Sequence, residues 1–575
     1  MLRKCSWIVL SLLVVASVAL SGCAPKPAPT AAPVEPVEPA TAAPTTAPEV
    51  TQPPEPKQAT LSLTSNPESM NPLYASTWYT EVVFDMILLP LWNIDDQGQY
   101  HMELAEEMPT VENGGISADG LTITIKLRQD ANWSDGTPVT ADDAVFTYDM
   151  TMNEKNTVFS AYPFDTYVES MTAVDPKTLQ IKLSGTYADW STAMFTGISR
   201  VIPKHILQPV FDKDGTLDNA DWNRTAEVVD GPYTLKEFVS DDHLTLEAND
   251  SYWRGRPKID TIYIRVFGDR QTQLAALQSG ESDIGSYIVG SEIPAIEETN
   301  NFEILSSPNG YIVTIYMNID PATAHPAMTD PNVRRALAMA IDRQLIIDKI
   351  YNGIYTIPAT YWDDTVYDNP DLKPYAFDPE GAKKLLEDAG WKVGADGVRE
   401  NDGKKLELRY VYISGDDTTD TMIVTFQQML ADVGVKLNIM PNTEEVLWAS
   451  YGDNGELAHG NYDLTQWSDG MWYFPSPSTS YFLCAERPTT DYPEGYNWFG
   501  ICDQSLEDLF AVADVEMDPQ KRIDDYHQIG KIMYDQTYLI PIRSDPDVWA
   551  VNKRLTNVKF SGVDPLMFVY EWDVK

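Results

Sequence analysis

The stretch from Leu121 to Met150 constrains the fold more than any other part of the chain, because three local signals follow one another in it. Leu121 to Arg128 alternates apolar and polar residues, which is the period-2 pattern of a half-buried strand. Asp135-Gly136 predicts a tight turn, since glycine tolerates positive φ and aspartate bonds its own backbone. Thr140, with Asp143 three residues later, is typical of a capped helix start. We therefore predict a strand, an exposed turn and a helix.

The rest of the chain repeats this alternation of strands and helices. A chain of 575 residues exceeds what one hydrophobic core can serve, so several domains are expected. Asp-Pro pairs that start helices occur at Asp330, Asp378 and Asp518, with predicted strands between them. The helix after Asp330 is predicted to run to Gly353. This order of elements predicts the α/β class.

The residue order in the 121–150 stretch also carries a family resemblance. Its pattern, L-R-x-x-A-x-W-S-D-G-x-P-V-T-A-x-D-x-x-F, closely resembles the signature of extracellular solute-binding proteins of the peptide/nickel family, which serve ABC importers. V-D-G-P-Y-T-L at 229–235, N-D-S-Y-W at 249–253 and G-E-S-D at 280–283 resemble further motifs of that family. The resemblance covers essentially residues 60 to 575.

The resemblance implies a particular architecture. It is the type II periplasmic-binding-protein-like fold, with two α/β lobes, a hinged cleft and an extra inserted domain. By that analogy the first lobe is discontinuous and comprises residues 58–94, 226–309 and 541–575. The inserted domain is expected at 95–225 and the second lobe at 310–540.

The N-terminus has the features of an export signal. Arg3 and Lys4 precede an apolar run too short for a comfortable membrane span, so residues 1–22 are predicted to be a signal peptide. The run ends in L-S-G-C, which resembles the bacterial lipobox and implies that Cys23 carries a lipid. Residues 23–57 are rich in proline and are predicted to form a stiff tether. We expect an exported protein, anchored through Cys23 to the outer face of the bacterial cytoplasmic membrane or in the periplasm.

Charge excludes one class of partner. The 41 basic residues stand against 86 acidic ones, a net charge of −45. Nucleic-acid binding is disfavoured, because phosphate contacts need clustered lysine and arginine. The excess of acid is typical of a soluble surface; the alternative is a field that attracts cationic solutes.

Four cysteines leave one open question. Cys5 lies in the predicted signal peptide and Cys23 in the lipobox, so Cys484 and Cys502 remain on the exported side. They form either a disulfide or two buried free thiols.

Motifs of catalysis and of metal binding are missing from the sequence. It contains no G-x-S-x-G elbow, no H-E-x-x-H and no Walker A loop. The six histidines are scattered without i, i+4 pairing. We therefore predict no enzyme, no catalytic residue, no cofactor and no metal site.

The candidate ligand site is the segment D-L-T-Q-W-S-D-G-M-W-Y at 463–473. In the peptide-binding branch of the family, the corresponding strand and loop present a tryptophan and then an aspartate that pairs with the peptide α-ammonium. Asp469 and Trp467 resemble that pair with one residue fewer between them. We expect flat apolar walls and a polar neighbour from a further set of four residues: Trp448, Gln466, Trp472 and Tyr473.

These features predict a monomeric, lipid-anchored receptor that closes on a ligand and delivers it to the transmembrane subunits of an ABC permease. The expected ligand is a neutral or cationic peptide, because arginines that hold the peptide carboxylate in some family members have no clear match. An oligosaccharide is the alternative, and nickel is least favoured without a histidine cluster. The rival classes are a secreted hydrolase and a sensory lipoprotein.

Overall fold

The computed structural model describes residues 55–470 and 477–575, with side chains described from Ser480 onward after the gap. Residue contacts group 56–575 into one compact unit. The predicted signal peptide, Cys23 and nearly all of the tether lie outside the described residues, as do Trp472 and Tyr473.

The signature stretch folds as predicted. Strand β4 (Thr122–Lys126) leads through the Asp135 turn to helix α2 (Ala141–Thr151). The Asp143 carboxylate accepts the backbone N–H of Thr140 at 2.8 Å and that of Lys204 at 2.9 Å. Asp143 therefore caps α2 and also ties it to the start of α5 (Lys204–Asp214).

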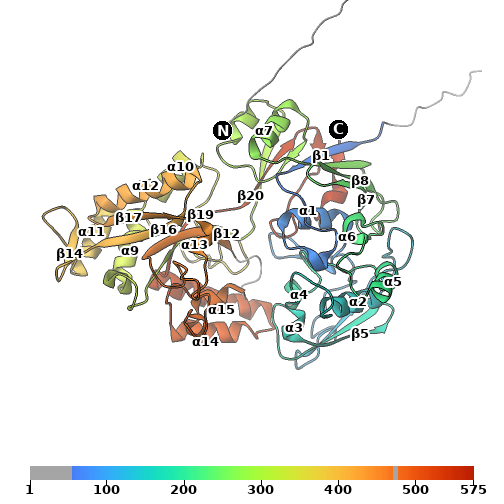
Figure 1. The fold of residues 1–575 in the computed structure, drawn as a ribbon, viewed down its shortest axis with the longest axis horizontal. Helices are drawn as coiled ribbons and strands as arrows, with labels where there is room; N and C mark the ends of the chain where they lie inside the picture. The colour runs from blue at the N-terminus through green and yellow to red at the C-terminus, as the bar shows by residue number, and fades with distance from the viewer. Residues whose placement is uncertain (1–54, 471–476) are drawn as a thin grey trace, which may run out of the picture. The chain divides into compact units, whose positions relative to one another are not determined.

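The first lobe is built on a seven-stranded sheet (Figure 1). Its order is β11 (Phe302–Ser307), β20 (Asp547–Asn552), β10 (Ile284–Gly285), β1 (Gln58–Leu63), β9 (Thr261–Val266), β8 (His243–Ala248) and β7 (Tyr233–Val239). β1 runs parallel to β9 and β10, whereas β20 runs antiparallel to β10 and β11. The helices are α1 (Trp78–Ile87), α7 (Arg270–Ser279) and α8 (Ile293–Glu297). A strand from the C-terminal end of the chain is thus inserted into the N-terminal sheet.

The inserted region lies between the hairpin β2 (Trp92–Ile94)–β3 (Tyr100–Met102) and β7. Its sheet has the order β4-β6-β5, with β5 (Val168–Asp175) and β6 (Thr178–Leu183). The remaining helices are α3 (Phe164–Tyr167), α4 (Trp190–Ala193) and α6 (Trp222–Thr225). One continuous apolar core serves this region and most of the first lobe.

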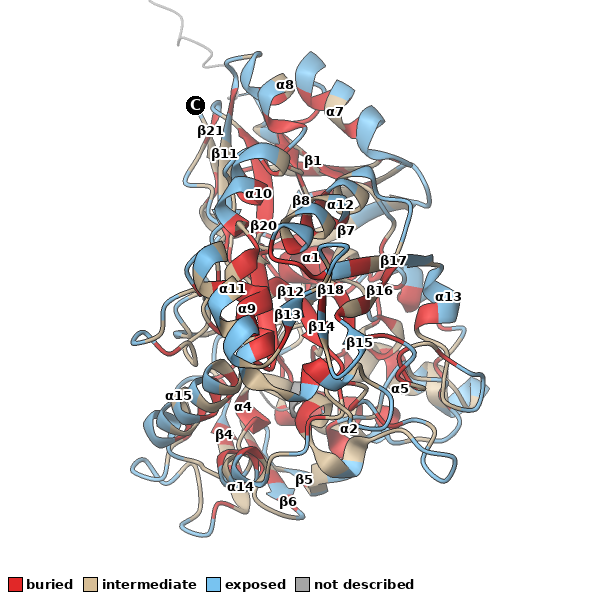
Figure 2. Ribbon diagram, turned by 90° about the vertical axis from the view of Figure 1, so that its left-hand side faces the viewer, coloured by how far each residue is buried: buried red, intermediate tan, exposed pale blue. Residues whose placement is uncertain are grey.

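The second lobe is built on a five-stranded sheet of order β17 (Lys436–Asn442), β16 (Glu407–Ile413), β18 (Leu464–Gly470), β12 (Tyr311–Met317) and β19 (Leu539–Ser544). One core lies against α9 (Pro331–Ala340), α10 (Arg343–Ile350), α11 (Pro379–Asp388) and α12 (Asp417–Asp432). The other lies against α13 (Glu444–Leu447), α14 (Gln504–Ala513) and α15 (Pro519–Gln536). In Figure 2 the central strands are buried, while the outer faces of the helices are exposed. Short strands complete the fold: β13 (Lys392–Val393), β14 (Arg399–Asn401), β15 (Lys404–Lys405), β21 (Leu555–Thr556) and β22 (Asp573–Val574).

Two expectations need correction. The helix predicted from Asp330 to Gly353 is two helices, α9 and α10, because the Asp342 side chain accepts the N–H of Leu345 at 2.9 Å and caps a new helix. The return of the chain to the first lobe, predicted at 541, lies after Ser544, because β19 pairs with β12 through Ser544. The chain therefore crosses between the two sheets twice, after Ser307 and after Ser544.

Candidate functional site

A cavity of about 860 Å³ lies where the chain crosses between the two sheets. The first lobe contributes Trp78, Tyr287 and Asp547 to its wall, and the second contributes Tyr351, Tyr355 and Arg543, among others. The volume falls within the usual range for small-molecule sites. Because both lobes line the cavity, its shape depends on the two crossing segments.

At the second-lobe end, the cavity wall already holds a cation. The guanidinium of Arg543 lies 4.5 Å from the ring centre of Tyr351 and 4.3 Å from that of Tyr355. The same guanidinium is paired with the carboxylate of Asp545, which also accepts the hydroxyl of Ser468. Two aromatic faces and a carboxylate thus neutralise one positive charge.

Asp469 sits at the end of β18 among hydroxyl and indole donors. Its carboxylate accepts the hydroxyls of Tyr316 at 3.1 Å and Tyr361 at 3.0 Å, the indole N–H of Trp467 at 3.3 Å and the N–H of Gly470 at 2.9 Å. Burial raises the pKa of this carboxyl, and the hydrogen bonds act against that rise. Among the described residues Asp469 forms no salt bridge. It is a half-buried acid whose partners in that part of the chain are polar donors and not a cation.

Aromatic rings surround this carboxylate. Tyr316 stacks on Trp467 with ring centres 3.9 Å apart and on Phe499 at 4.6 Å. Trp448 meets Trp467 edge-on at 4.8 Å. The predicted residues Trp448, Trp467 and Asp469 are therefore brought together.

Gln466 is not part of that group. In the β12–β18 ladder Gln466 lies opposite Ile315, whereas Asp469 lies opposite Ile312. Ile315 and Ile312 belong to the cores on opposite faces of the sheet. Alternation along the strand thus puts Gln466 and Ser468 on one face, and Trp467 and Asp469 on the other.

Several site residues had no clear signal in the sequence. Tyr316 lies in β12, and its position on the Trp467 face follows only from strand pairing. Tyr361 lies in an irregular segment with no motif. Trp78, Tyr287 and Asp547 come from distant parts of the chain and meet only in the folded lobe.

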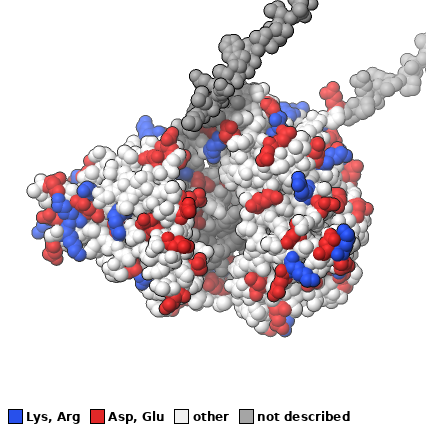
Figure 3. Space-filling view, in the orientation of Figure 1, with Lys and Arg blue, Asp and Glu red and all other residues white. Residues whose placement is uncertain are grey.

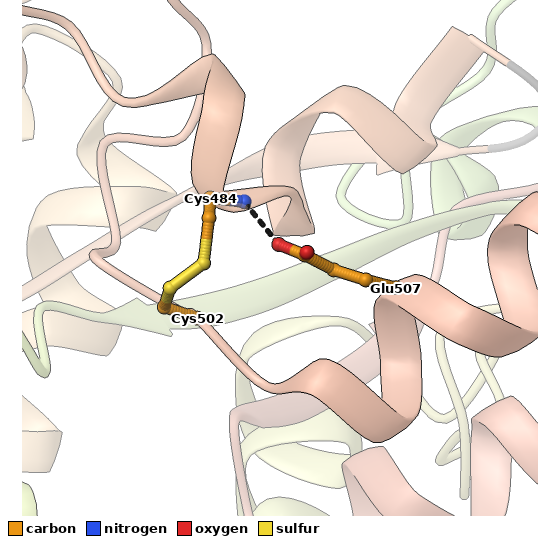
Figure 4. Close-up of side chains that lie close together, drawn as sticks. All are labelled: Cys484, Cys502 and Glu507. Carbon is orange, nitrogen blue, oxygen red and sulfur yellow. Dashed lines mark hydrogen bonds between the residues drawn. A yellow bond between two sulfur atoms is a disulfide. The ribbon is translucent and has the colours of Figure 1, made fainter.

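Cys484 and Cys502 are joined by a disulfide, one of the two alternatives left open by the sequence. Figure 4 shows the bond and Glu507, whose carboxylate accepts the N–H of Cys484 at 2.7 Å. These three residues form the one group of three or more potential metal ligands found in the described part of the chain. Because a disulfide sulfur is not a thiolate, the group as it stands is a covalent link within the loop.

Two further observations concern surface charge and the length of the apolar helices. Acidic side chains are spread over both lobes on the face shown in Figure 3 rather than gathered in one patch. Within residues 55–470 and 477–575, no helix is both long and apolar enough to cross a bilayer.

Two α/β lobes joined by two chain crossings, with a cavity lined from both, define the class of two-lobed binding proteins that enclose a small molecule. The model of "Bacterial extracellular solute-binding proteins, family 5 Middle" matches residues 99–491. The chain belongs to this family of extracellular solute-binding proteins, which are not enzymes.

Known relatives cover most of the chain. The oligopeptide-binding protein AppA of Bacillus subtilis is 25% identical over 82% of this chain and 83% of its own length. The dipeptide-binding protein of Escherichia coli is 25% identical over 87% of this chain and 91% of its own. The crystal structure of the ABC transporter substrate-binding protein CtaP of Listeria monocytogenes matches with a TM-score of 0.74 and 25% identity, covering 90% of this chain and 99% of that one. These matches agree with the predicted family and the two-lobed fold.

Proposed function

We propose that this solute-binding protein is the peptide receptor of an ABC importer and that Asp469 receives the α-ammonium group of the peptide. The observation that carries the proposal is the state of Asp469, a half-buried carboxylate with four donors and no salt bridge in the described part of the chain. Such a group is costly to bury unless a cation joins it when the ligand binds.

The short pairing between β18 and β16 supports a peptide over other solutes. On one side β18 pairs with β12 along its whole length, from Leu464 to Gly470. On the other side, among the described residues, β16 pairs with it only at Tyr410 and Leu464. The remaining backbone groups of that edge can pair with the main chain of an extended peptide.

The similar proteins support the same ligand class and partner. Relatives are named oligopeptide-binding and dipeptide-binding proteins, and the structure of CtaP is named as an ABC transporter component. By analogy the partner is a membrane permease. Anchoring through a lipid on Cys23 remains part of the proposal and rests on the lipobox-like sequence.

An oligosaccharide is the second candidate. The ring centre of Trp498 lies 5.5 Å from that of Trp448 and 6.2 Å from that of Trp467. Three indole rings are therefore close together beside Asp469. Indole faces stack on sugar rings as readily as on apolar side chains.

Calorimetry on unfolded-and-refolded, ligand-free protein separates these candidates. Peptides with a free N-terminus should bind, whereas their N-acetylated forms and oligosaccharides should not. Asp469→Ala should weaken peptide binding by about 2–5 kcal/mol, because the ammonium group is left buried and unpaired. Asp491→Ala, which removes an exposed carboxylate of the same lobe, is the matched control. Equal affinity for free and acetylated peptides would remove Asp469 from this role, and binding of sugars alone would replace the ligand class.

A further inference from the structure

The two ends of the interlobe cavity have the same kinds of side chain but a different charge balance. At the second-lobe end, Tyr351, Tyr355 and Asp545 enclose the guanidinium of Arg543. This end shows how the cavity wall holds a cation: aromatic faces on two sides and a carboxylate beside it.

The first-lobe end repeats these components around Asp547. Asp547 is 5% exposed and lines the cavity. Trp78 and Tyr287 line the same end, with ring centres 4.3 Å apart. The carboxylate of Asp547 accepts the side-chain N–H of Asn309 at 3.2 Å. Two aromatic rings and a buried carboxylate are therefore in place.

What this end lacks is a positive charge. No salt bridge joins Asp547 to a basic side chain among the residues described. Burial raises the pKa of Asp547 to about 7, hydrogen bonds from Asn309 and Trp78 oppose that rise, and the charged neighbour that acts on it, Asp545, is an acid. Arg543 is neutralised by Asp545, and Arg270 is exposed and acts on Glu292. The first-lobe end thus matches the Arg543 end without its cation.

We propose that the end of the cavity formed by Trp78, Tyr287 and Asp547 takes the cationic side chain, an ammonium or guanidinium group, of a bound peptide. This proposal rests on the proposed function. It adds that the cavity, which is lined by Ser468 of β18 and not by Asp469, is a further part of the peptide site, with a preference for lysine- or arginine-containing peptides. The ring faces attract the cation through their quadrupoles, and Asp547 supplies the counter-charge in a site partly shielded from water.

Paired peptides test this preference directly. Two peptides of identical sequence, with lysine or norleucine at one position scanned along the chain, have the same stem length and differ in charge. At one position the wild-type protein should bind the lysine peptide at least about tenfold more tightly. Asp547→Asn should remove most of that ratio by weakening the lysine peptide. Asp491→Asn, which makes the same charge change on the exposed surface, should leave the ratio as it is.

A second variant keeps the test possible if the first does not fold. If Asp547→Asn does not fold, Trp78→Leu, which removes the ring and keeps the carboxylate, should lower the same lysine-to-norleucine ratio. A wild-type ratio near one at every position, or an Asp547→Asn variant that weakens both peptides equally, would overturn the subsite.

A separate arm distinguishes failure of this proposal from failure of the proposed function. If no peptide binds the wild-type protein, the proposed function as a peptide receptor is wrong. Butylammonium then serves as the probe: quenching or enhancement of Trp78 fluorescence, absent in Trp78→Leu and lost in Asp547→Asn, supports the cation subsite by itself. No difference between wild type and Asp547→Asn with butylammonium overturns it.

Discussion

Arg522 of α15 and Asp189, the residue before α4, form a buried ion pair that joins the second lobe to the inserted region. Both residues are at most 5% exposed. The rings of Tyr367 and Tyr526 lie 5.9 Å from the guanidinium. The pair is therefore a contact between the lobes that lies outside the two chain crossings.

Removing one partner of this pair should be costly. Arg522→Ala leaves Asp189 buried without a counter-charge, and we expect a loss of about 3–5 kcal/mol in the free energy of unfolding. The double variant Arg522→Met/Asp189→Leu removes both charges and should recover most of that loss. Urea unfolding of the single and double variants gives the coupling between the two sites. Additive losses would show that the two charges do not interact.

The disulfide should stabilise both the loop and the Asp469 site. It closes a segment with a sequence separation of 18, for which loop closure predicts about 3 kcal/mol. The segment carries Phe499, whose ring stacks on Tyr316, a donor to Asp469. Cys484→Ser/Cys502→Ser should therefore lower the unfolding temperature and also weaken peptide binding well below that temperature. A stability loss with unchanged affinity would limit the disulfide to a structural role.

Asp230 should make stability depend on pH. Burial raises its pKa to about 8, with a further rise from Asp143 and a fall from Arg200, while the N–H of Leu89 bonds its carboxylate at 2.9 Å. Because the folded pKa exceeds the unfolded value of about 4, the stabilisation is full below about pH 4 and is lost as the pH rises to about 8. The slope reaches about 1.4 kcal/mol per pH unit.

Asp230→Asn removes this titration. The variant should gain stability relative to wild type between about pH 5 and about pH 8, and the difference should shrink toward acid pH. Asp85 and Asp547, with pKa values raised to about 7 by burial, titrate in both proteins, so the difference between the two curves isolates Asp230. Parallel curves from urea unfolding would contradict the assignment.

Gly231 of the V-D-G-P-Y motif has a steric role that a single substitution can test. A Cβ atom built there would lie 2.5 Å from the carbonyl carbon of Ile87, and the Gly231 N–H donates to the Ile87 oxygen at 2.9 Å. Gly231→Ala should cost about 1–3 kcal/mol through backbone displacement. Gly185→Ala, where no atom lies within 4 Å, should change stability by less than about 0.5 kcal/mol. Similar melting temperatures for the two variants would contradict this account.

Local signals predicted much of the fold. Strand β4, Thr122–Lys126, lies inside the predicted Leu121 to Arg128, because its period-2 pattern reflects burial on one face. The Asp-Pro starts at Asp330, Asp378 and Asp518 each cap a helix. The break at Asp342 was missed, because an aspartate inside an apolar helical pattern can either face solvent or cap a new helix, and the sequence does not distinguish the two.

The candidate site was predicted less completely. Trp467 and Asp469 were predicted from the resemblance of their segment to a motif of the peptide-binding branch. That segment alone did not separate Gln466 from Asp469, whereas the strand presents the two residues to opposite faces. Trp78, Tyr287 and Asp547 could not be grouped, since only the sheet order places them at one end of the cavity.

The position of β20 between β11 and β10 has a consequence for how the protein is made. During synthesis the N-terminal part of the chain appears first, yet its sheet lacks a strand between two others until the last residues are released. Until then β10 and β11 present unpaired edges to any neighbouring chain. The N-terminal sheet of a nascent chain therefore stays incomplete while the second lobe folds. Whether the chain folds or aggregates depends on whether the edges of β10 and β11 are protected during that interval.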